Sequence, residues 1–274
     1  MKNLTGKVAV ITGAGSGIGR ALAKAFAAEG CHLALVDIND SGLQETQTQI
    51  NQQIPTPITI TRHTCNVADA DAVKTLAQEI HQQQGAIHLL FNNAGITINK
   101  SFEDSSLQDL ERVFGVNLWG VLYGCYYFLP YLKQQSEAHI INTSSLAGFM
   151  GMPNQAGYCA SKAAVKSLSE TICAELAVHN IHVTSIHPGT ISTSILRTAA
   201  DSSGKNANTT HKMANLMERY GKSPDKLAQK VVKAVKKNRM QVRIGIDSYL
   251  GDVFKRLLPQ VIHLPFRWGF KKAM

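Results

Sequence analysis

The stretch KVAVITGAGSGIGRALAKAFAAEG, residues 7–30, decides the fold. Its first part is a short run of β-branched and apolar residues that breaks at Gly13. Its second part is rich in Ala, has apolar residues at helical spacing and stops at Gly30. The stretch therefore predicts a strand, a glycine-rich turn and a helix in direct succession.

The turn between this strand and this helix is suited to an anion. It points backbone N–H groups and the positive end of a helix at a bound phosphate. The spacing G-x3-G-x-G differs from the common dinucleotide motif G-x-G-x-x-G, because position 18 is Ile. Tight turns without ligands use the same residues, but the position after the first strand favours nucleotide binding. The candidate cofactor residues here are Gly13, Ser16, Gly17, Ile18 and Gly19.

Apolar runs and helical patterns alternate along the rest of the chain. Further strands are expected within residues 32–39, 54–67, 87–95, 139–145 and 181–189, and helices over 69–85, 107–135 and 158–179. Strands of this kind indicate a parallel sheet covered on both faces, joined by right-handed crossovers. We expect an α/β fold: a doubly wound, Rossmann-type parallel sheet in one three-layer αβα domain over residues 1–274, with a C-terminal helical extension.

An acidic residue ends the second expected strand. Asp37 can accept hydrogen bonds from a ribose 2′-hydroxyl and would repel a 2′-phosphate. The neighbouring Ile38, Asn39 and Asp40 offer no cation for such a phosphate, and Arg20 is expected on the helix. This arrangement favours NAD over NADP, with Asp37 and Ile38 beside the ribose, although Asp37 could also be an ordinary turn residue.

A tyrosine and a lysine stand four residues apart in GYCASKAAVK, residues 157–166. Residues at this spacing share one face of a helix, and a Tyr against a Lys stem is ordinary surface packing. The alternative is functional: the Lys162 ammonium lowers the pKa of the Tyr158 phenol, which can then exchange protons. The two residues alone leave both interpretations open.

Six motifs in order resemble the short-chain dehydrogenase/reductase superfamily over residues 4–195. They are the glycine turn, NNAG at 92–95, Asn117 in a long helix, Ser144–Ser145, Y-x3-K at 158–162 and PGTIST at 188–193. The resemblance implies that Tyr158 is the general acid/base and that Lys162 holds the nicotinamide ribose and lowers the tyrosine pKa. It also implies that Ser145, preferred to Ser144 on spacing, binds the substrate oxygen with Tyr158, and that Asn117 anchors a chain of water molecules.

The same resemblance implies further contacts to the cofactor. NNAG resembles the loop beside the adenosine, and PGTIST resembles the segment that holds the carboxamide. In CNVAD, Asn66 stands where many relatives have Asp, and its side-chain oxygen can still accept from the adenine amino group. The residues implied are Asn66, Val67, Asn93, Ala94, Gly95, Tyr158, Lys162, Pro188, Gly189, Ile191 and Thr193.

Composition and charge bear on the cellular compartment, on metal binding and on where the positive charge of the chain lies. Five scattered Cys without a C-x-x-C pair suit a reducing cytoplasm, and the first residues lack the pattern of a signal peptide. The His residues show no metal-ligand spacing, so no metal is expected. Residues 1–221 carry 15 Lys and Arg against 16 Asp and Glu, whereas residues 222–274 carry 13 against 3. The excess positive charge therefore belongs to the C-terminal fifth.

This basic end, about residues 247–274, mixes Lys and Arg with Leu, Phe and Trp. It could lie on an anionic membrane, dock an acidic partner or another subunit, or form a solvated helix face. Nucleic acid is not expected, since basic charge alone is weak evidence for it. The resemblance implies a homodimer or homotetramer that pairs the helix over 107–135 and the Tyr158 helix.

The expected activity is NAD-dependent interconversion of a secondary alcohol and a ketone, on a hydrophobic small molecule. A 3-oxoacyl thioester reductase using NADPH is one alternative, and a non-catalytic dinucleotide-binding regulator is another. The polar, helix-poor segment over residues 198–214 predicts a substrate lid within about 190–220.

Overall fold

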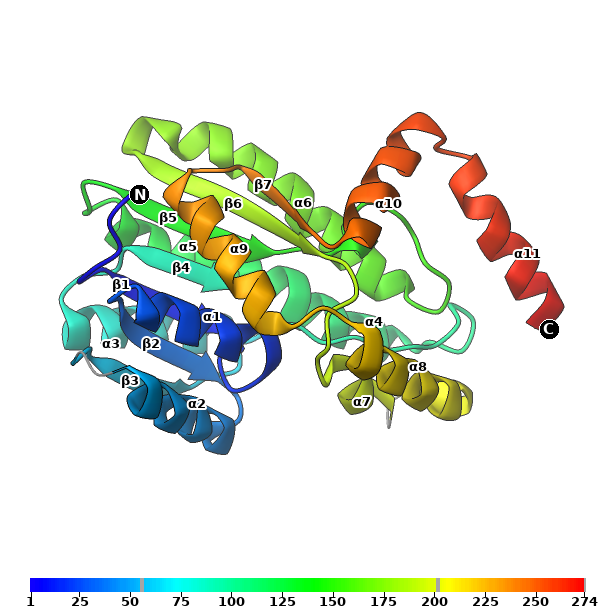
Figure 1. Ribbon diagram of the computed structural model, residues 1–274, viewed down its shortest axis with the longest axis horizontal. Coiled ribbons are helices and arrows are strands. Elements are labelled where there is room, and N and C mark those ends of the chain that lie inside the picture. The colour runs from blue at the N-terminus through cyan, green and yellow to red at the C-terminus, as the bar shows by residue number, and fades with distance from the viewer. Residues whose placement is uncertain (55–56, 201–202, 274) are drawn as a thin grey trace.

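The computed structural model describes residues 1–54, 57–200 and 203–273. It contains a parallel sheet of seven strands in the order β3-β2-β1-β4-β5-β6-β7 (Figure 1). The strands are β1 Val8–Thr12, β2 His32–Asp37, β3 Ile60–Thr64, β4 Leu89–Asn92, β5 Ala138–Thr143, β6 Ile181–Pro188 and β7 Gln241–Ile244. The strand order turns back beside β1, between β1 and β4, which brings the carboxyl ends of the central strands to one edge.

Helices cover both faces of this sheet. One layer holds α1 Gly17–Ala28, α2 Asp40–Gln53 and α9 Pro224–Lys236, and the other holds α3 Ala70–Gln84, α5 Gly120–Leu132 and α6 Ala156–Glu175. Figure 1 shows α1 and α9 side by side on the near face. The strand residues are apolar because both sides are covered: Ala9 and Ile11 pack toward α1, and Val10 toward α3. The predicted doubly wound, three-layer fold is confirmed.

The helix predicted over residues 107–135 is observed with an interruption. It comprises α4 Leu107–Phe114, a π-helical turn η1 Gly115–Trp119 and α5. A capping box between Ser106 and Asp109 starts it. A π turn inserts an extra residue into a helix, and such turns are frequent at functional sites; Asn117 lies in the middle of this one and is buried.

The prediction of a helix-poor segment over residues 198–214 is wrong. This segment contains the end of α7 Ile195–Ala200 and the start of α8 Ala207–Tyr220, joined by the 3-10 turn η4 Gly204–Asn206. Residues 201 and 202 of the segment lie outside the described residues. The polar composition suggested a loop, because only one side of α8 is covered, at Thr210 and Ala214, and the rest of the helix is polar. An amphipathic helix needs few apolar residues when a single narrow stripe is buried.

The chain continues beyond β7 as the predicted helical extension. It consists of α10 Ile246–Leu257, the 3-10 turn η5 Val261–His263 and α11 Leu264–Ala273. α10 packs on the short 3-10 helix η2 Leu146–Gly148, which follows β5. Figure 1 shows α11 (red) lying apart from the sheet and its covering helices.

Candidate functional site

The glycine-rich turn lies at the carboxyl end of β1, as predicted. Gly13 and Gly17 have φ of 69° and 51°, which favours residues without a Cβ. A Cβ on Gly19 would collide with the carbonyl of Gly13, so the turn and the helix start touch. The helix α1 begins at Gly17 with Ser16 as its N-cap, and no acidic side chain stands in its first turn. The backbone here can approach an anion at the positive end of α1.

Asp37 ends β2 directly beside this turn. Its Oδ2 accepts a hydrogen bond from the N–H of Gly15 at 2.9 Å, and its Oδ1 accepts one from the N–H of Asn39 at 3.0 Å. The following Ile38 is 71% exposed. The carboxylate is therefore fixed next to the turn, and each oxygen retains a lone pair for a further donor.

The guanidinium of Arg20, which lies beside the turn, is already engaged in hydrogen bonds. Arg20 forms a bidentate pair with Glu45, with N···O distances of 2.7 and 2.8 Å. Its Nη2 also donates to the carbonyl of Gly15 at 2.5 Å, and its Nε donates to Thr46 at 3.0 Å. A planar guanidinium held in two directions by such bonds is fixed in place.

The loop after β4 closes over the other side of the turn. The backbone N–H groups of Asn93 and Ala94 both donate to the hydroxyl of Thr12, at 2.9 and 3.0 Å, and the Asn93 amide donates to the carbonyl of Thr12. Gly95 follows, and a Cβ there would lie 3.3 Å from Asn117 Oδ1 and 3.4 Å from Lys162 Nζ. The loop thus links the glycine turn to the residues of α6.

Asn66 and Val67 lie beyond β3. The side-chain oxygen of Asn66 accepts from the N–H of Ala68 at 3.1 Å. Val67 is buried and packs against Gly120 of α5, where a Cβ would lie 2.9 Å from the valine side chain. Both residues therefore face the same end of the sheet as Asp37.

The segment after β6 returns to the glycine turn. The N–H of Gly189, which follows Pro188, donates to Ile244 at 2.8 Å, and Asp247 accepts from the N–H of Thr190 at 2.6 Å. Ile191 is buried and forms a parallel bridge with Lys222. Thr193 Cγ2 lies 3.3 Å from the position of a Cβ on Gly17. The predicted residues of PGTIST and of the glycine turn are thus in direct contact.

Lys162 is buried in the centre of the site, with 3% of its surface exposed. Its Nζ donates to the carbonyl of Thr143, at the end of β5, at 2.8 Å, and it lies 5.8 Å from the centroid of the Tyr158 ring. Burial lowers the pKa of this ammonium to about 8. The lysine is not the exposed surface residue of the ordinary packing interpretation.

Asn117 and the two serines have distinct partners. The Asn117 amide donates to and accepts from the backbone of Ile96, both at 2.9 Å, and donates to Ser161 of α6 at 3.2 Å. The Ser144 hydroxyl donates to the carbonyl of Lys162 at 2.8 Å. Ser145 instead caps η2 and forms a hydrogen bond with the Tyr158 side chain. The site therefore brings Ser145, not Ser144, to the phenol.

The pKa of Tyr158 differs in direction from the sequence prediction. Burial raises the pKa of the phenol, and the hydrogen bond with Ser145 opposes that rise. The Lys162 ammonium donates to the carbonyl of Thr143 and not to the phenolic oxygen, so it makes no hydrogen bond that would oppose this rise. Desolvation is the largest cause of the shift, and the lowering of this pKa by Lys162 through its charge stays a prediction.

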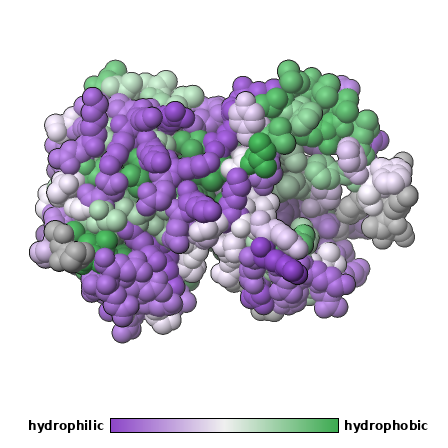
Figure 2. Space-filling view, viewed as in Figure 1, coloured by the Kyte–Doolittle hydropathy of each residue, from purple (hydrophilic) through white to green (hydrophobic). Residues whose placement is uncertain are grey.

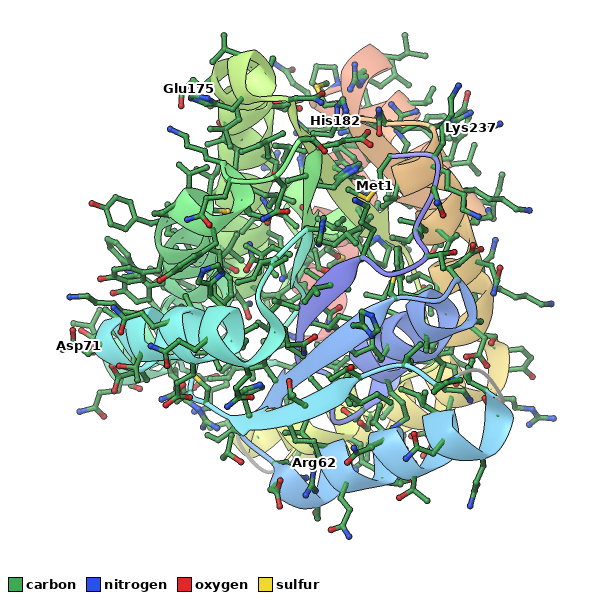
Figure 3. The ribbon with its side chains drawn as sticks, turned by 90° about the vertical axis from the view of Figure 1, so that its left-hand side faces the viewer. Met1, Arg62, Asp71, Glu175, His182 and Lys237 are labelled. Atoms are coloured by element: carbon green, nitrogen blue, oxygen red, sulfur yellow. The ribbon has the colours of Figure 1, made fainter. Side chains whose placement is uncertain are left out.

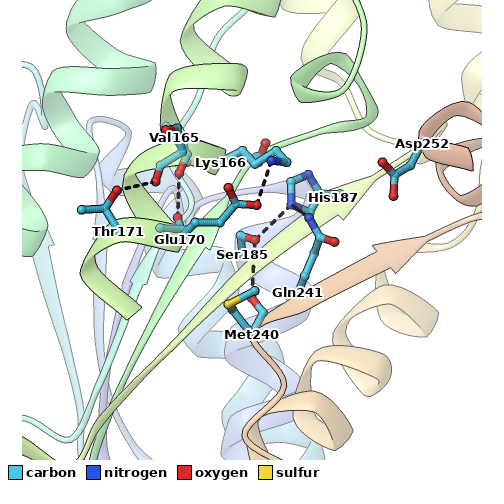
Figure 4. A network of polar contacts seen from close by, with 12 residues as sticks. Val165, Lys166, Glu170, Thr171, Ser185, His187, Met240, Gln241 and Asp252 are labelled. Atoms are coloured by element: carbon cyan, nitrogen blue, oxygen red, sulfur yellow. Dashed lines mark hydrogen bonds and ion pairs between the residues drawn. The ribbon is translucent and has the colours of Figure 1, made fainter. Parts of the chain in front are cut away.

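His187 is buried beside Ser185 and Gln241 (Figure 4), and it also contacts the backbone of Ser145. Nδ1 of His187 lies 3.2 Å from the Ser145 carbonyl, and Nε2 lies 3.0 Å from the Ser185 hydroxyl and 3.3 Å from the Gln241 amide. The His187 ring stacks on Phe149 at 4.3 Å between centroids. Burial lowers the pKa of His187 to about 4, so the ring is neutral at pH 7.

Thr12, Thr143 and His187 are not among the residues predicted from the motifs. Thr12 accepts from the loop after β4, and the carbonyl of Thr143 accepts from the Lys162 ammonium. The His187 ring contacts the carbonyl of Ser145. All three stand at or near the carboxyl ends of strands β1, β5 and β6. Polar residues at that edge of a parallel sheet are the signal that could have found them.

A hollow of about 760 Å³ lies at the opposite end of the sheet, far from these residues. Met1, Lys7, Glu137 and Lys236 are among the residues that line it. Figure 3 shows Met1, His182 and Lys237 at this end. The amino group of Met1 pairs with Glu137 at 2.5 Å, which ties the start of the chain to the loop before β5. We assign no chemistry to this hollow, because it lies far from the residues predicted to bind the cofactor and the substrate.

Two further findings concern the described ranges only. Within residues 1–54, 57–200 and 203–273, no three His, Cys, Asp or Glu side chains gather as a metal ion would require. In the same part of the chain, every helix is too short or too polar to traverse a lipid bilayer.

The sequence of the chain is similar to those of known oxidoreductases. The family model for short chain dehydrogenases matches residues 7–204. The chain is 36% identical over 262 residues to the oxidoreductase SadH of Mycobacterium tuberculosis, covering 94% of this chain and 93% of SadH. It is 34% identical over 251 residues to the 3-oxoacyl-acyl-carrier-protein reductase FabG of Thermotoga maritima, covering 90% and 98%.

A solved structure agrees over almost the whole chain. The NAD complex of a short chain dehydrogenase/reductase from Burkholderia phymatum superposes with a TM-score of 0.86 at 29% identity, covering 95% of this chain and 96% of that one. Together with the family match, this places the sequence motifs in their expected fold. The chain therefore belongs to the short-chain dehydrogenase family, and it is an oxidoreductase that acts on CH–OH groups with a nicotinamide dinucleotide.

Proposed function

We propose that the protein interconverts a secondary alcohol and a ketone, with NAD as its cofactor and Tyr158 as the general acid/base. One observation carries the proposal: the half-buried Tyr158 side chain forms a hydrogen bond with Ser145, and the Lys162 ammonium lies 5.8 Å from the centroid of its ring. A half-buried phenol beside a hydroxyl and a buried cation is unusual for a purely structural site. It is what proton transfer to or from a substrate oxygen requires.

The residues present fit a dinucleotide. The glycine turn and the start of α1 would receive the pyrophosphate, Asp37 the adenosine ribose, and Asn66 and Val67 the adenine. Lys162 would hold the nicotinamide ribose, and the segment from Pro188 to Thr193 would hold the carboxamide. When bound, the nicotinamide ring accepts hydride from an alcohol carbon or donates it to a ketone.

In alcohol oxidation Tyr158 takes the hydroxyl proton of the substrate, and in ketone reduction it returns one. Ser145 donates a hydrogen bond to the substrate oxygen, which gains negative charge as the reaction proceeds. Lys162 contributes a fixed positive charge beside the phenol, which favours the phenolate once the ring is deprotonated. Asn117 holds the backbone of Ile96 and anchors the route by which protons reach solvent.

The edge of the site supports NAD over NADP. A 2′-phosphate on the ribose would meet the Asp37 carboxylate, which two backbone N–H groups hold in place. Arg20, a cation beside the turn, is committed to Glu45 and to the Gly15 carbonyl. Like charges at such short range disfavour binding of the phosphate strongly.

The substrate is proposed to be hydrophobic. Apolar side chains stand on the segments beside Ser145 and Ile96, and α7 and α8 form the lid over them. Those segments supply Ile96, Ile98, Phe149, Met150, Met152 and Leu196. Pockets for apolar molecules have this composition, with a few polar groups that fix orientation.

A homodimer or homotetramer is proposed, with α5 and α6 at the interface. On the outer side of α5, Tyr126 is 73% exposed, and Trp119, just before it, is 50% exposed and stacks on Tyr123. Exposed aromatic rings that pack on one another are typical of protein interfaces.

The NADPH-dependent 3-oxoacyl thioester reductase stays as an alternative, because FabG is among the relatives. A regulator without catalysis is disfavoured, since it would not need Asn117, Ser145, Tyr158 and Lys162 together in one site. Steady-state rates with NAD and with NADP, over a panel of aliphatic, cyclic and steroidal alcohols, separate these alternatives. NAD-dependent turnover of a secondary alcohol supports the proposal; exclusive use of NADPH with 3-oxoacyl thioesters would overturn it.

A further inference from the structure

A stripe of exposed apolar side chains runs along α10. Ile246, Leu250, Phe254 and Leu257 are 64%, 43%, 49% and 71% exposed. Their spacing places all four within an arc of about 80° on one side of the helix. Figure 2 shows hydrophobic side chains gathered in this region.

The stripe continues past the end of α10. Leu258, Val261, Leu264 and Trp268 are 45%, 50%, 53% and 64% exposed. We call these eight residues the C-terminal apolar face. Single exposed apolar residues are normal, but eight of them along two successive helices and the turn between them mark a surface that contacts something else.

The opposite side of α10 is anchored to the enzyme. The hydroxyl of Ser248 donates to the carbonyl of His187 at 2.8 Å, and a Cβ on Gly251 would collide with Leu146. Asp252 is 4% exposed in its side chain and pairs with Arg243 and Arg256 at 2.6 and 2.8 Å. These contacts fix the helix so that the apolar stripe points away from the sheet.

Positive charge accompanies this face. Residues 246–274 carry five Lys and Arg against two Asp. Lys255 and Arg256 flank the stripe on α10, and Arg267 stands on α11 next to Trp268. Apolar side chains bordered by cations match the boundary between the headgroups and acyl chains of an anionic bilayer.

We propose that the C-terminal apolar face binds the surface of an anionic lipid membrane, with α10 and α11 lying in its interfacial plane. Both signals that stable peripheral binding needs are present, an apolar face and basic charge. A second copy is a poorer occupant, because a twofold interface would bring this basic segment against itself. Insertion among the lipid headgroups removes the C-terminal apolar face from water and brings the neighbouring Lys and Arg side chains to lipid phosphates.

The test is flotation with lipid vesicles, in phosphatidylcholine alone and in phosphatidylcholine mixed with phosphatidylglycerol. The wild-type protein is compared with Leu257→Glu/Leu264→Glu, which places two carboxylates on the apolar face. Val178→Glu is the matched control, because Val178 is 83% exposed and stands in η3 Leu176–His179, after α6. Circular dichroism and light scattering compare the fold and the oligomeric state of the three proteins.

We expect the wild type and Val178→Glu to float with the anionic vesicles, less so at high salt and less with phosphatidylcholine alone. We expect the double variant to lose binding by about tenfold or more. The proposal is overturned if the wild type stays unbound, or if the double variant floats as well as the control. It is also overturned if the double variant falls to a smaller oligomer while vesicle binding is unchanged, since a second copy then covers this face.

Discussion

Lys162 and Tyr158 lie one turn apart on α6, yet they do not share a hydrogen bond. The Lys162 Nζ donates to the carbonyl of Thr143 at 2.8 Å and lies 5.8 Å from the centroid of the tyrosine ring. The phenol instead has Ser145 as its hydrogen-bond partner. The cation therefore acts on the phenol through space, and its position depends on β5.

This relationship predicts different outcomes for two lysine variants. Lys162→Met removes the charge, so we expect the acidic limb of the kcat/KM–pH profile for alcohol oxidation, where Tyr158 must lose its proton, to move to higher pH, with about 10–100-fold lower activity at pH 7. Lys162→Arg keeps a cation, so its kcat/KM–pH profile is expected to lie closer to that of the wild type. Profiles that are identical in the wild type and the Met variant would show that the charge has no role in proton transfer.

The cofactor preference should depend on Asp37 and on the pairing of Arg20. We expect Asp37→Ser to raise the NADP/NAD ratio of kcat/KM by about tenfold or more, because the repulsion of a 2′-phosphate is removed. Adding Glu45→Ala should raise it further, since Arg20 is then released. Glu175→Ala, which removes an exposed carboxylate elsewhere, is the control for net charge. An unchanged NADP/NAD ratio of kcat/KM in the double variant would refute the role of Asp37 and Arg20 in cofactor preference.

The glycine turn should not tolerate a side chain at Gly19. A Cβ there would meet the carbonyl of Gly13 and would lie 2.9 Å from the Asn93 amide. We expect Gly19→Ala to cost about 2 kcal/mol or more in unfolding free energy and to weaken NAD binding. Gly151→Ala is the matched control, since nothing lies within 4 Å of a Cβ at that position. Chemical denaturation and cofactor titration measure both effects; equal behaviour of the two variants would contradict the close approach of Gly19 to Gly13.

Two buried histidines should make the fold sensitive to acid. Burial lowers the pKa of His139 to about 3 and that of His187 to about 4. In the unfolded chain both have a pKa near 6.5, so the unfolded state binds more protons between pH 6.5 and 4. Their contribution is fully present above about pH 6.5 and falls by about 1.4 kcal/mol per histidine for each pH unit below it.

The variant His139→Gln isolates one of these contributions. We expect the slope of unfolding free energy against pH between pH 6.5 and 4.5 to be shallower by about 1.4 kcal/mol per unit. His179→Gln, at an exposed position, should leave the slope as it is. Urea denaturation across this range provides the measurement, and a wild-type slope in His139→Gln would refute the assignment.

The sequence predicted those features that depend on local pattern. The strand–turn–helix unit around Gly13, the acid at the end of β2 and the face shared by Tyr158 and Lys162 are each set by residues close in the chain. The helix α8 was missed, because one narrow buried stripe leaves most of its residues polar. The hydrogen-bond partner of the Lys162 ammonium could not be predicted, since it is a backbone carbonyl at the end of β5. The support of Ser145 by His187 likewise depends on β6 and β7 meeting in space.

The most direct measurement of the central claim compares the wild type with Tyr158→Phe, using NAD and a secondary alcohol that the wild type oxidises. The phenylalanine ring keeps the shape of the tyrosine and removes only the hydroxyl that exchanges the proton. We expect NAD to bind the variant with nearly unchanged affinity and the turnover rate to fall by about 10²–10⁴-fold. A variant that oxidises the alcohol as fast as the wild type would show that Tyr158 is not the acid/base.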